Sequence, residues 1–194
     1  MKYPLSLAFR ILSWGPQISV HDADGSLALY VKQKALKLKE AVTVFADEAQ
    51  TEPLYRIAAD RVIDFAARYS FRDARDEALG SIKRQGMKSI WKARYDIFDD
   101  GQVTMTIAEE NPWVKVLDAT FSSIPLVGIF SGYLLHPAYV VSDVDGAPVM
   151  RLVKQPAFFE GKFTIEKLAD MKEADETRAL LGLLMMILLE RGRG

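Results

Sequence analysis

The chain has 194 residues, of which 49% are hydrophobic and 26% are charged. This composition excludes an intrinsically disordered chain, and the length suits one compact domain over residues 1–194. The formal charge at pH 7 is −1, but residues 31–94 hold 14 Lys or Arg against 9 Asp or Glu, whereas residues 95–194 hold 9 against 15. The absence of cysteine excludes disulfides, thiolate metal sites and cysteine nucleophiles.

The N-terminal stretch MKYPLSLAFRILSWG is rich in apolar residues, but Arg10 interrupts it and no small-residue cleavage site follows. A secretory signal requires an unbroken apolar region followed by such a site. We therefore expect a cytoplasmic protein, and we count residues 4–12 as a candidate strand.

Six short stretches that alternate apolar and polar residues recur along the chain, and five of them end in Asp. A period of two is typical of strands that bury one face. Asp-Gly pairs and other turn residues follow most of these stretches, which favours tight hairpins. The sequence predicts eleven or twelve strands, with first strands at residues 18–22, 43–47, 69–73, 95–99, 139–143 and 163–167 and partners at 26–31, 53–58, 78–83, 102–107 and 148–153.

Two of the turns, DADG and DVDG, place carboxylates at alternate positions, an arrangement that calcium loops also use. An EF-hand loop requires a third oxygen position, a later glycine and a closing glutamate, and these are missing here. We interpret both segments as hairpin turns, and we expect no metal and no cofactor.

One interval of the repeat is longer than the others, which indicates an insertion at residues 112–137. The uncharged stretch 119–142 contains two prolines, two glycines and four serines, a composition that disfavours a continuous membrane-spanning helix. A surface loop with a short helix near PLVGIF is the first interpretation, and a peripheral contact with a membrane is the alternative.

The C-terminal run ALLGLLMMILL, residues 179–189, contains no charged residue. Eleven helical residues rise about 16 Å, which is too short for a hydrocarbon core of about 30 Å. A helix that is apolar on every side must otherwise be surrounded by protein, and a closed sheet of a dozen strands leaves a lumen for it. The sequence predicts a helix over residues 174–190 inside a barrel, with Gly182 close to a strand and with Leu180, Leu181, Leu184, Met185, Ile187 and Leu188 in the core.

The segments RVIDF, SIWKARYDIFDDG, GYLLHPAYVVSDVDG and KQPAFFEGKFTIE, followed by an apolar C-terminal helix, resemble the LURP-one-related family within the tubby C-terminal-like and phospholipid scramblase superfamily. The resemblance extends from about residue 17 to the end of the chain. It implies an all-β fold with a central helix, in which a twelve-stranded barrel closes around the buried C-terminal helix.

The resemblance implies one fold but several different functions, because one fold hosts several roles. Tubby relatives bind phosphoinositides through basic side chains on the barrel exterior. Scramblases are calcium-linked membrane proteins with lipidated cysteines, and a chain without cysteine excludes that anchor. The acidic segment 166–176 lies where scramblases bind calcium, but its carboxylates lack the required spacing, and stabilisation of a helix N-terminus is the better explanation.

Basic residues suggest a surface for anionic phospholipid or phosphoinositide head groups. In KALKLK, alternation puts Lys37 and Lys39 on one solvated face. Lysines on strands also protect sheet edges from aggregation, and this alternative stays open. The candidate ligand-binding residues are Lys32, Lys34, Lys37, Lys39, Lys83, Arg84 and Lys88.

A structural or protein-interaction module that uses residues 113–137 is the alternative function. Its apolar residues would form an interface patch, and no nucleic acid is expected as a partner. An enzyme is not expected, since the two histidines, His21 and His136, lie near no recognisable nucleophile or metal motif. The apolar residues of the predicted patch are Trp113, Phe121, Ile124, Leu126, Phe130 and Tyr133.

Overall fold

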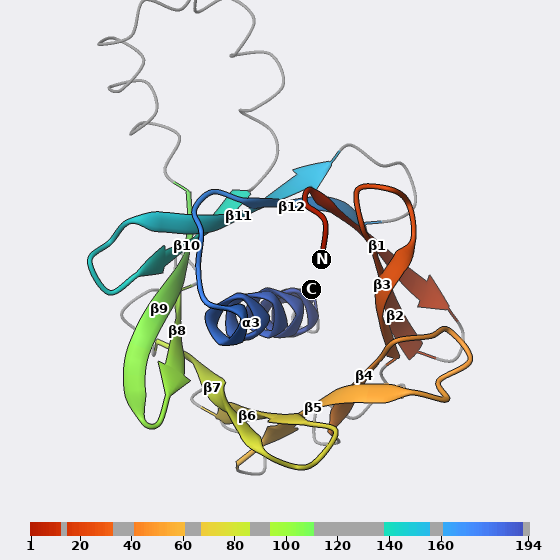
Figure 1. The fold of residues 1–194 in the computed structure, drawn as a ribbon, viewed down its shortest axis with the longest axis horizontal. Helices are drawn as coiled ribbons and strands as arrows, with labels where there is room; N and C mark the ends of the chain where they lie inside the picture. The colour runs from red at the N-terminus through yellow and green to blue at the C-terminus, as the bar shows by residue number, and fades with distance from the viewer. Residues whose placement is uncertain are drawn as a thin grey trace, which may run out of the picture.

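Twelve strands form one closed antiparallel barrel in the computed structural model (Figure 1). Each strand pairs with its neighbours in the chain, and β1 pairs with β12 to close the barrel. The helix α3 lies inside. The structure describes residues 1–12, 15–32, 41–60, 67–85, 94–110, 138–155 and 161–191.

The strands coincide with the predicted ones to within a few residues, and the candidate strand at residues 4–12 is β1. Their bounds are β1 (Leu5–Leu12), β2 (Gly15–His21), β3 (Leu27–Lys32), β4 (Val42–Phe45), β5 (Pro53–Ala59), β6 (Arg68–Asp73), β7 (Ala78–Arg84), β8 (Arg94–Asp99), β9 (Gln102–Glu109), β10 (Ala138–Asp143), β11 (Pro148–Gln155) and β12 (Gly161–Lys167). The predicted all-β barrel with a central helix is confirmed.

The repeated aspartates stabilise hairpin turns. Oδ1 of Asp73 accepts the backbone N–H groups of Arg75 and Glu77 at 2.9 and 2.8 Å. Oδ1 of Asp143 accepts those of Asp145 and Ala147 at 3.0 and 2.9 Å. Short polar side chains favour turns because they satisfy turn backbone in this way.

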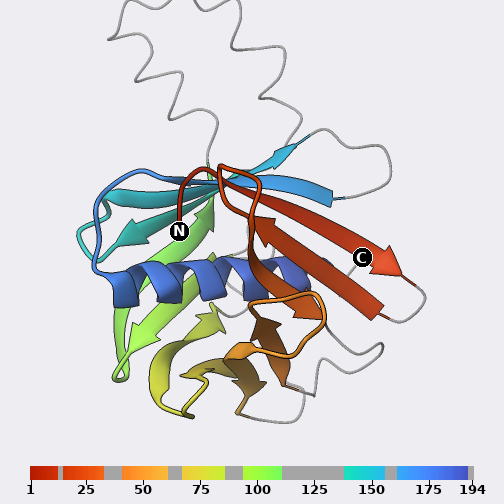
Figure 2. The same ribbon diagram turned by 45° about the vertical axis from the view of Figure 1, so that its right-hand side comes forward.

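The β2–β3, β4–β5, β6–β7, β8–β9 and β10–β11 hairpins, whose turns the structure describes, all turn at the same end of the barrel, since the strands alternate in direction. We call this the turn end, and the end at which α3 finishes the opposite end (Figure 2). The turn end consists of residues 22–26, 46–52, 73–77, 99–101, 143–147 and 168–173.

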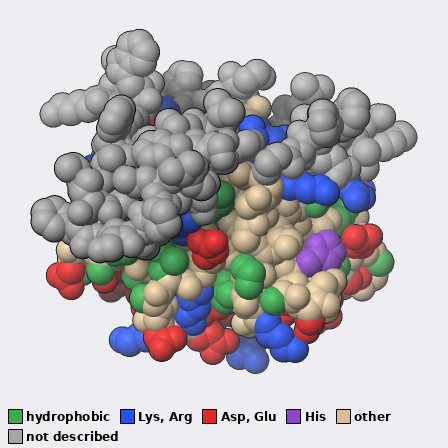
Figure 3. Space-filling view, turned by 90° about the horizontal axis from the view of Figure 1, so that it is seen from above, with side chains coloured by type: hydrophobic (Ala, Val, Ile, Leu, Met, Phe, Trp, Pro, Cys, Tyr) green, Lys and Arg blue, Asp and Glu red, His purple; other side chains and the backbone are tan. Residues whose placement is uncertain are grey.

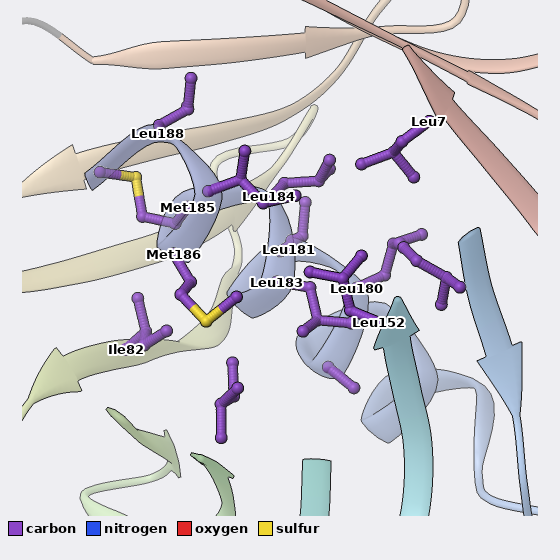
Figure 4. Close-up of a cluster of buried hydrophobic side chains, with 14 of the residues drawn as sticks. Leu7, Ile82, Leu152, Leu180, Leu181, Leu183, Leu184, Met185, Met186 and Leu188 are labelled. Atoms are coloured by element: carbon purple, nitrogen blue, oxygen red, sulfur yellow. The ribbon is translucent and has the colours of Figure 1, made fainter. Parts of the chain in front are cut away.

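The helix α3 (Glu173–Arg191) begins at the turn end and runs through the barrel (Figure 2). Its predicted bounds, 174–190, differ by one residue at each end. Side chains leave the helix in all directions toward the surrounding strands, where Leu7, Ile82 and Leu152 lie (Figure 4). The six residues predicted for the core are all at most 4% exposed, so the apolar run fills the barrel.

Gly182 is the point at which the helix comes close to the sheet, as predicted. A Cβ atom there would lie 2.8 Å from Cδ1 of Ile97 on β8 and 3.4 Å from Cδ1 of Ile107 on β9. Glycine otherwise costs a helix about 1 kcal/mol relative to alanine. Here the missing side chain leaves room for two buried isoleucines.

Polar contacts hold each end of α3. At the turn end, the buried Arg178 pairs with Asp99 of β8 at 2.5 Å and with Asp175 at 3.4 Å. At the opposite end, the Tyr95 hydroxyl donates to the carboxylate of Glu190, which also lies 3.7 Å from Nε of Arg84. The acidic residues Glu173, Asp175 and Glu176 occupy the first turn of the helix, where they stabilise its N-terminus.

In the part of the chain that the structure describes, no helix is both long enough and apolar enough to cross a membrane. The insertion at residues 112–137, its predicted short helix and its predicted interface patch lie outside the described residues.

Candidate anion-binding surface

A row of basic side chains crosses the outer wall of the barrel from β1 to β6. The strand register pairs Arg10 with Gln17, Gln17 with Lys32 and Lys32 with Thr43. Thr43 pairs with Arg56, and Arg56 pairs with Arg72. Cross-strand partners share a face of the sheet, so these six residues form one row with four cations and no carboxylate. We call it the basic row: Arg10, Gln17, Lys32, Thr43, Arg56 and Arg72.

The row faces outward because its chain neighbours fill the core. Four residues next to row members in the chain are at most 2% exposed, namely Phe9, Val31, Ile57 and Phe71. Successive side chains along a strand point to opposite faces of the sheet. Burial of the apolar set therefore places the basic set in solvent.

The row also runs obliquely along the barrel, as the tilt of barrel strands requires. Arg10 lies late in β1, near the opposite end, whereas Arg72 lies next to the β6–β7 turn at the turn end. Neighbouring strands lie about 4.8 Å apart, so Arg10, Lys32 and Arg56, on alternate strands, are separated by about 10 Å, whereas Arg56 and Arg72 are direct cross-strand partners. A surface that carries several anionic groups matches this spacing better than one phosphate does.

Within the described ranges, two cations of the row form no ion pair with an acidic group. Among the described residues, no ion pair involves Lys32 or Arg56, and Arg56 is exposed. Arg72 donates to the carbonyl of Asp76 at 2.7 Å and lies 3.4 Å from its carboxylate, which reduces the charge available at that end.

The pKa of Tyr30 responds to charged groups near Arg10. Burial raises the pKa of the Tyr30 phenol, nearby Glu48 raises it further, and Arg10 opposes both effects. Glu48 and Arg10 therefore act on Tyr30 with opposite sign.

Of the predicted ligand-binding residues, only Lys32 is seen to belong to the basic row. Lys83 lies on the outer face of β7, paired with Arg68 on one side and Asp96 on the other. Arg84 shares the inward face with the buried Ile82 and lies near Glu190 of the helix. Lys34, Lys37, Lys39 and Lys88 lie outside the described residues.

The sequence prediction missed Arg10, Arg56 and Arg72. A signal for them existed, because each stands directly beside an apolar residue that alternation assigns to the core. Their alignment into one row depends on the register between strands, which alternation does not specify.

Charged side chains elsewhere on the barrel are mixed in sign. On the wall seen in Figure 3, basic side chains border the residues drawn in grey, and both acidic and basic side chains lie along the opposite edge. Arg151 illustrates the pairing, since it lies 2.9 Å from Glu110 and 3.4 Å from Glu166.

Two tyrosines near the ends of the helix have raised pKa values. Burial, followed by the carboxylate of Glu176, raises the pKa of the Tyr3 phenol. Burial, with Glu190 and Glu109, raises the pKa of Tyr139. Both phenols stay protonated at neutral pH. Within the described residues, no three His, Asp or Glu side chains are grouped so as to hold a metal ion, and His136 lies outside them.

The chain is similar to a known protein family and to a known structure. No curated protein matches the chain. An X-ray structure of a protein from Arabidopsis thaliana is similar over 98% of this chain and 92% of its own, with 18% identity and a TM-score of 0.48. The family model described as LURP-one-related matches residues 27–155, which is more than half of the chain. The chain belongs to the LURP-one-related family.

Proposed function

We propose that this chain is a non-enzymatic binding domain that holds anionic phospholipid or phosphoinositide head groups against its outer wall. The observation that carries the proposal is the basic row, in which four cations cross six strands without a carboxylate. Lys and Arg contact phosphate oxygens through charge-assisted hydrogen bonds, and Arg does so with two parallel donors.

The geometry favours a surface with many anions. A row of cations that extends over six strands of a convex wall cannot close around one phosphate, but it can rest on several head groups. Each basic residue near an anionic membrane contributes about 1 kcal/mol. Lys32 and Arg56, which form no ion pair with any residue that the structure describes, would then account for about 2 kcal/mol, or about 30-fold in binding.

The test is flotation of the purified chain with vesicles of phosphatidylcholine alone, with added phosphatidylserine, or with added phosphoinositide. We expect binding to the two anionic vesicles and a decrease at higher salt, because surface charges are screened over about 8 Å at physiological ionic strength. A soluble inositol phosphate added as competitor distinguishes a head-group site from a response to a charged surface.

Lys32→Gln/Arg56→Gln should weaken vesicle binding by about 30-fold. The matched control is Lys172→Gln/Arg75→Gln, which removes the same two kinds of charge from the turn end and should leave binding within about threefold. Lys34→Gln/Lys37→Gln/Lys39→Gln tests the cluster that the sequence predicts. Failure of the wild-type chain to float with either anionic vesicle would refute the proposal.

A further inference from the structure

A hollow at the turn end lies on the side of the barrel away from the basic row. Its volume is about 670 Å³, within the range of about 300–1,000 Å³ that binding pockets occupy. It is formed by the start of β9, the β10–β11 hairpin and the segment that leads from β12 into α3. None of these elements carries a member of the basic row.

The floor of the hollow is apolar. Met105, Val149 and Met171 line it, and two of them are methionines, whose unbranched side chains adapt to different partners. Val144, which also lines the hollow, is 69% exposed, and apolar surface continues beyond the hollow at Leu168, which is 47% exposed. The N–H of Leu168 donates to the carbonyl of Val149 at 2.9 Å, which places this second apolar residue beside the floor.

The rim of the hollow is acidic. Asp143, Asp170 and Asp175 line it together with one cation, Lys172. Asp143 and Asp175 already bond to the turn backbone and to Arg178. The exposed Asp170 makes no hydrogen bond or ion pair within the described part of the chain, and it acts on Lys167 only through space. Asp170 is therefore the rim carboxylate that is free to receive a cation.

The charge of the turn end around the hollow also favours a cationic ligand. The segments of the turn end hold fourteen Asp or Glu and two Lys or Arg. Four further cations at this end pair with individual carboxylates, namely Lys2, Arg72, Lys167 and Arg178, and the acidic residues still outnumber the basic ones. Such an excess of one sign attracts and concentrates partners of the other sign. An apolar floor inside an acidic field is complementary to a ligand that is both basic and apolar.

We propose that this hollow docks a basic, amphipathic segment of a partner protein, with an apolar side chain on Met105, Val149 and Met171 and a Lys or Arg beside Asp170. A protein segment fits better than a small amine, because the exposed Leu168 extends the apolar contact beyond the hollow. The site is independent of the basic row, so either proposal can fail without the other.

The probe is a fluorescein-labelled peptide of alternating leucine and lysine, titrated with the full chain and followed by fluorescence anisotropy. Two control peptides carry glutamate in place of lysine or serine in place of leucine. We expect saturable binding of the first peptide, no binding of the glutamate peptide, and at least about tenfold weaker binding of the serine peptide. Equal binding of the leucine and serine peptides would overturn the role of the apolar floor.

Asp170→Lys should weaken the leucine–lysine peptide by at least about tenfold, since it puts a like charge beside the bound cation. Met171→Gln should also weaken binding of this peptide, because it places a polar amide in the apolar floor. Glu77→Lys makes the same charge change on the same end, outside the hollow, and should have less than about a threefold effect. Equal losses in Asp170→Lys and Glu77→Lys would overturn the proposal in favour of a diffuse acidic field.

Two other occupants give distinct results. Competition by spermine as effective as that by unlabelled peptide would assign the hollow to small polycations and overturn the protein partner. Sedimentation of the chain alone tests a second copy, because self-association that Asp170→Lys abolishes would make this face a homotypic contact. Unchanged melting temperatures verify that the variants are folded.

Discussion

The turn end and the outer wall of the barrel present opposite charges for different reasons. At the turn end, fourteen acidic residues stand in short segments of the chain, and several of them accept hydrogen bonds from the turn that they belong to. On the outer wall, the basic row joins residues as distant as Arg10 and Arg72 through five successive strand pairings. The acidic end is a local property of the sequence, whereas the basic row is a property of the register between strands.

The largest expected effect is a difference in stability between substitutions at the two ends of α3. Arg178→Met removes a buried guanidinium that pairs with Asp99 and Asp175, and it should lower the free energy of unfolding by about 2 kcal/mol. The carboxylate of Asp99 is half exposed, so water compensates part of the loss. Urea denaturation gives the value.

Arg191→Met is the matched change at the other end of the same helix. Arg191 lies 4.1 Å from the centre of the Phe9 ring and should contribute about 0.5–1 kcal/mol. A loss for Arg191→Met as large as that for Arg178→Met would contradict the view that the turn end anchors the helix.

A smaller effect should show that the repeated aspartates are turn residues. Asp73→Ala leaves two turn N–H groups without their acceptor and should lower the free energy of unfolding by about 1 kcal/mol. The control is Glu77→Ala, whose side chain forms no hydrogen bond or ion pair among the described residues. Thermal unfolding measures the stability of both variants. Equal losses would contradict the view that the Asp73 side chain stabilises the turn.

The smallest effect is local and depends on pH. The hydrogen bond from Lys2, followed by those from Ser26, lowers the pKa of Asp24 to about 2 from its ordinary value of 3.8. The contacts around a carboxylate with a lowered pKa are complete above its ordinary pKa and are lost as the pH falls toward the lowered one. We expect the β2–β3 turn to loosen between about pH 4 and pH 2.

An NMR titration of the Asp24 carboxyl measures this shift directly. Lys2→Gln should return the pKa of Asp24 toward its ordinary value, because the charged donor is the largest cause of the shift. A lowered pKa that persists in Lys2→Gln would assign the effect to the Ser26 donors instead.

Much of the fold follows from local pattern. Alternation and turn residues place all twelve strands, because each strand must bury one face and each hairpin requires turn chemistry. The helix follows from length and composition, since an apolar run too short for a bilayer requires a protein environment. The close approach of Gly182 to a strand was also predicted, because a helix surrounded by a barrel must pack against its strands.

The candidate surfaces were less predictable. Lys32 and Lys83 look equivalent in the sequence, but register places Lys32 in a row of cations and Lys83 beside Asp96. Arg84 looks like a surface residue next to Lys83, but alternation along β7 turns it toward Glu190. The hollow beside Met171 joins three segments that are distant in sequence, and no local pattern announces it.

The sequence by itself determined the strands, the hairpins, the acidic turns and the buried helix, because these depend on side chains within a few residues of one another. Only the tertiary structure decided which cations share a row, which arginines face the helix and where a hollow remains. Those outcomes depend on strand register and barrel closure, which bring together side chains that the chain itself keeps far apart.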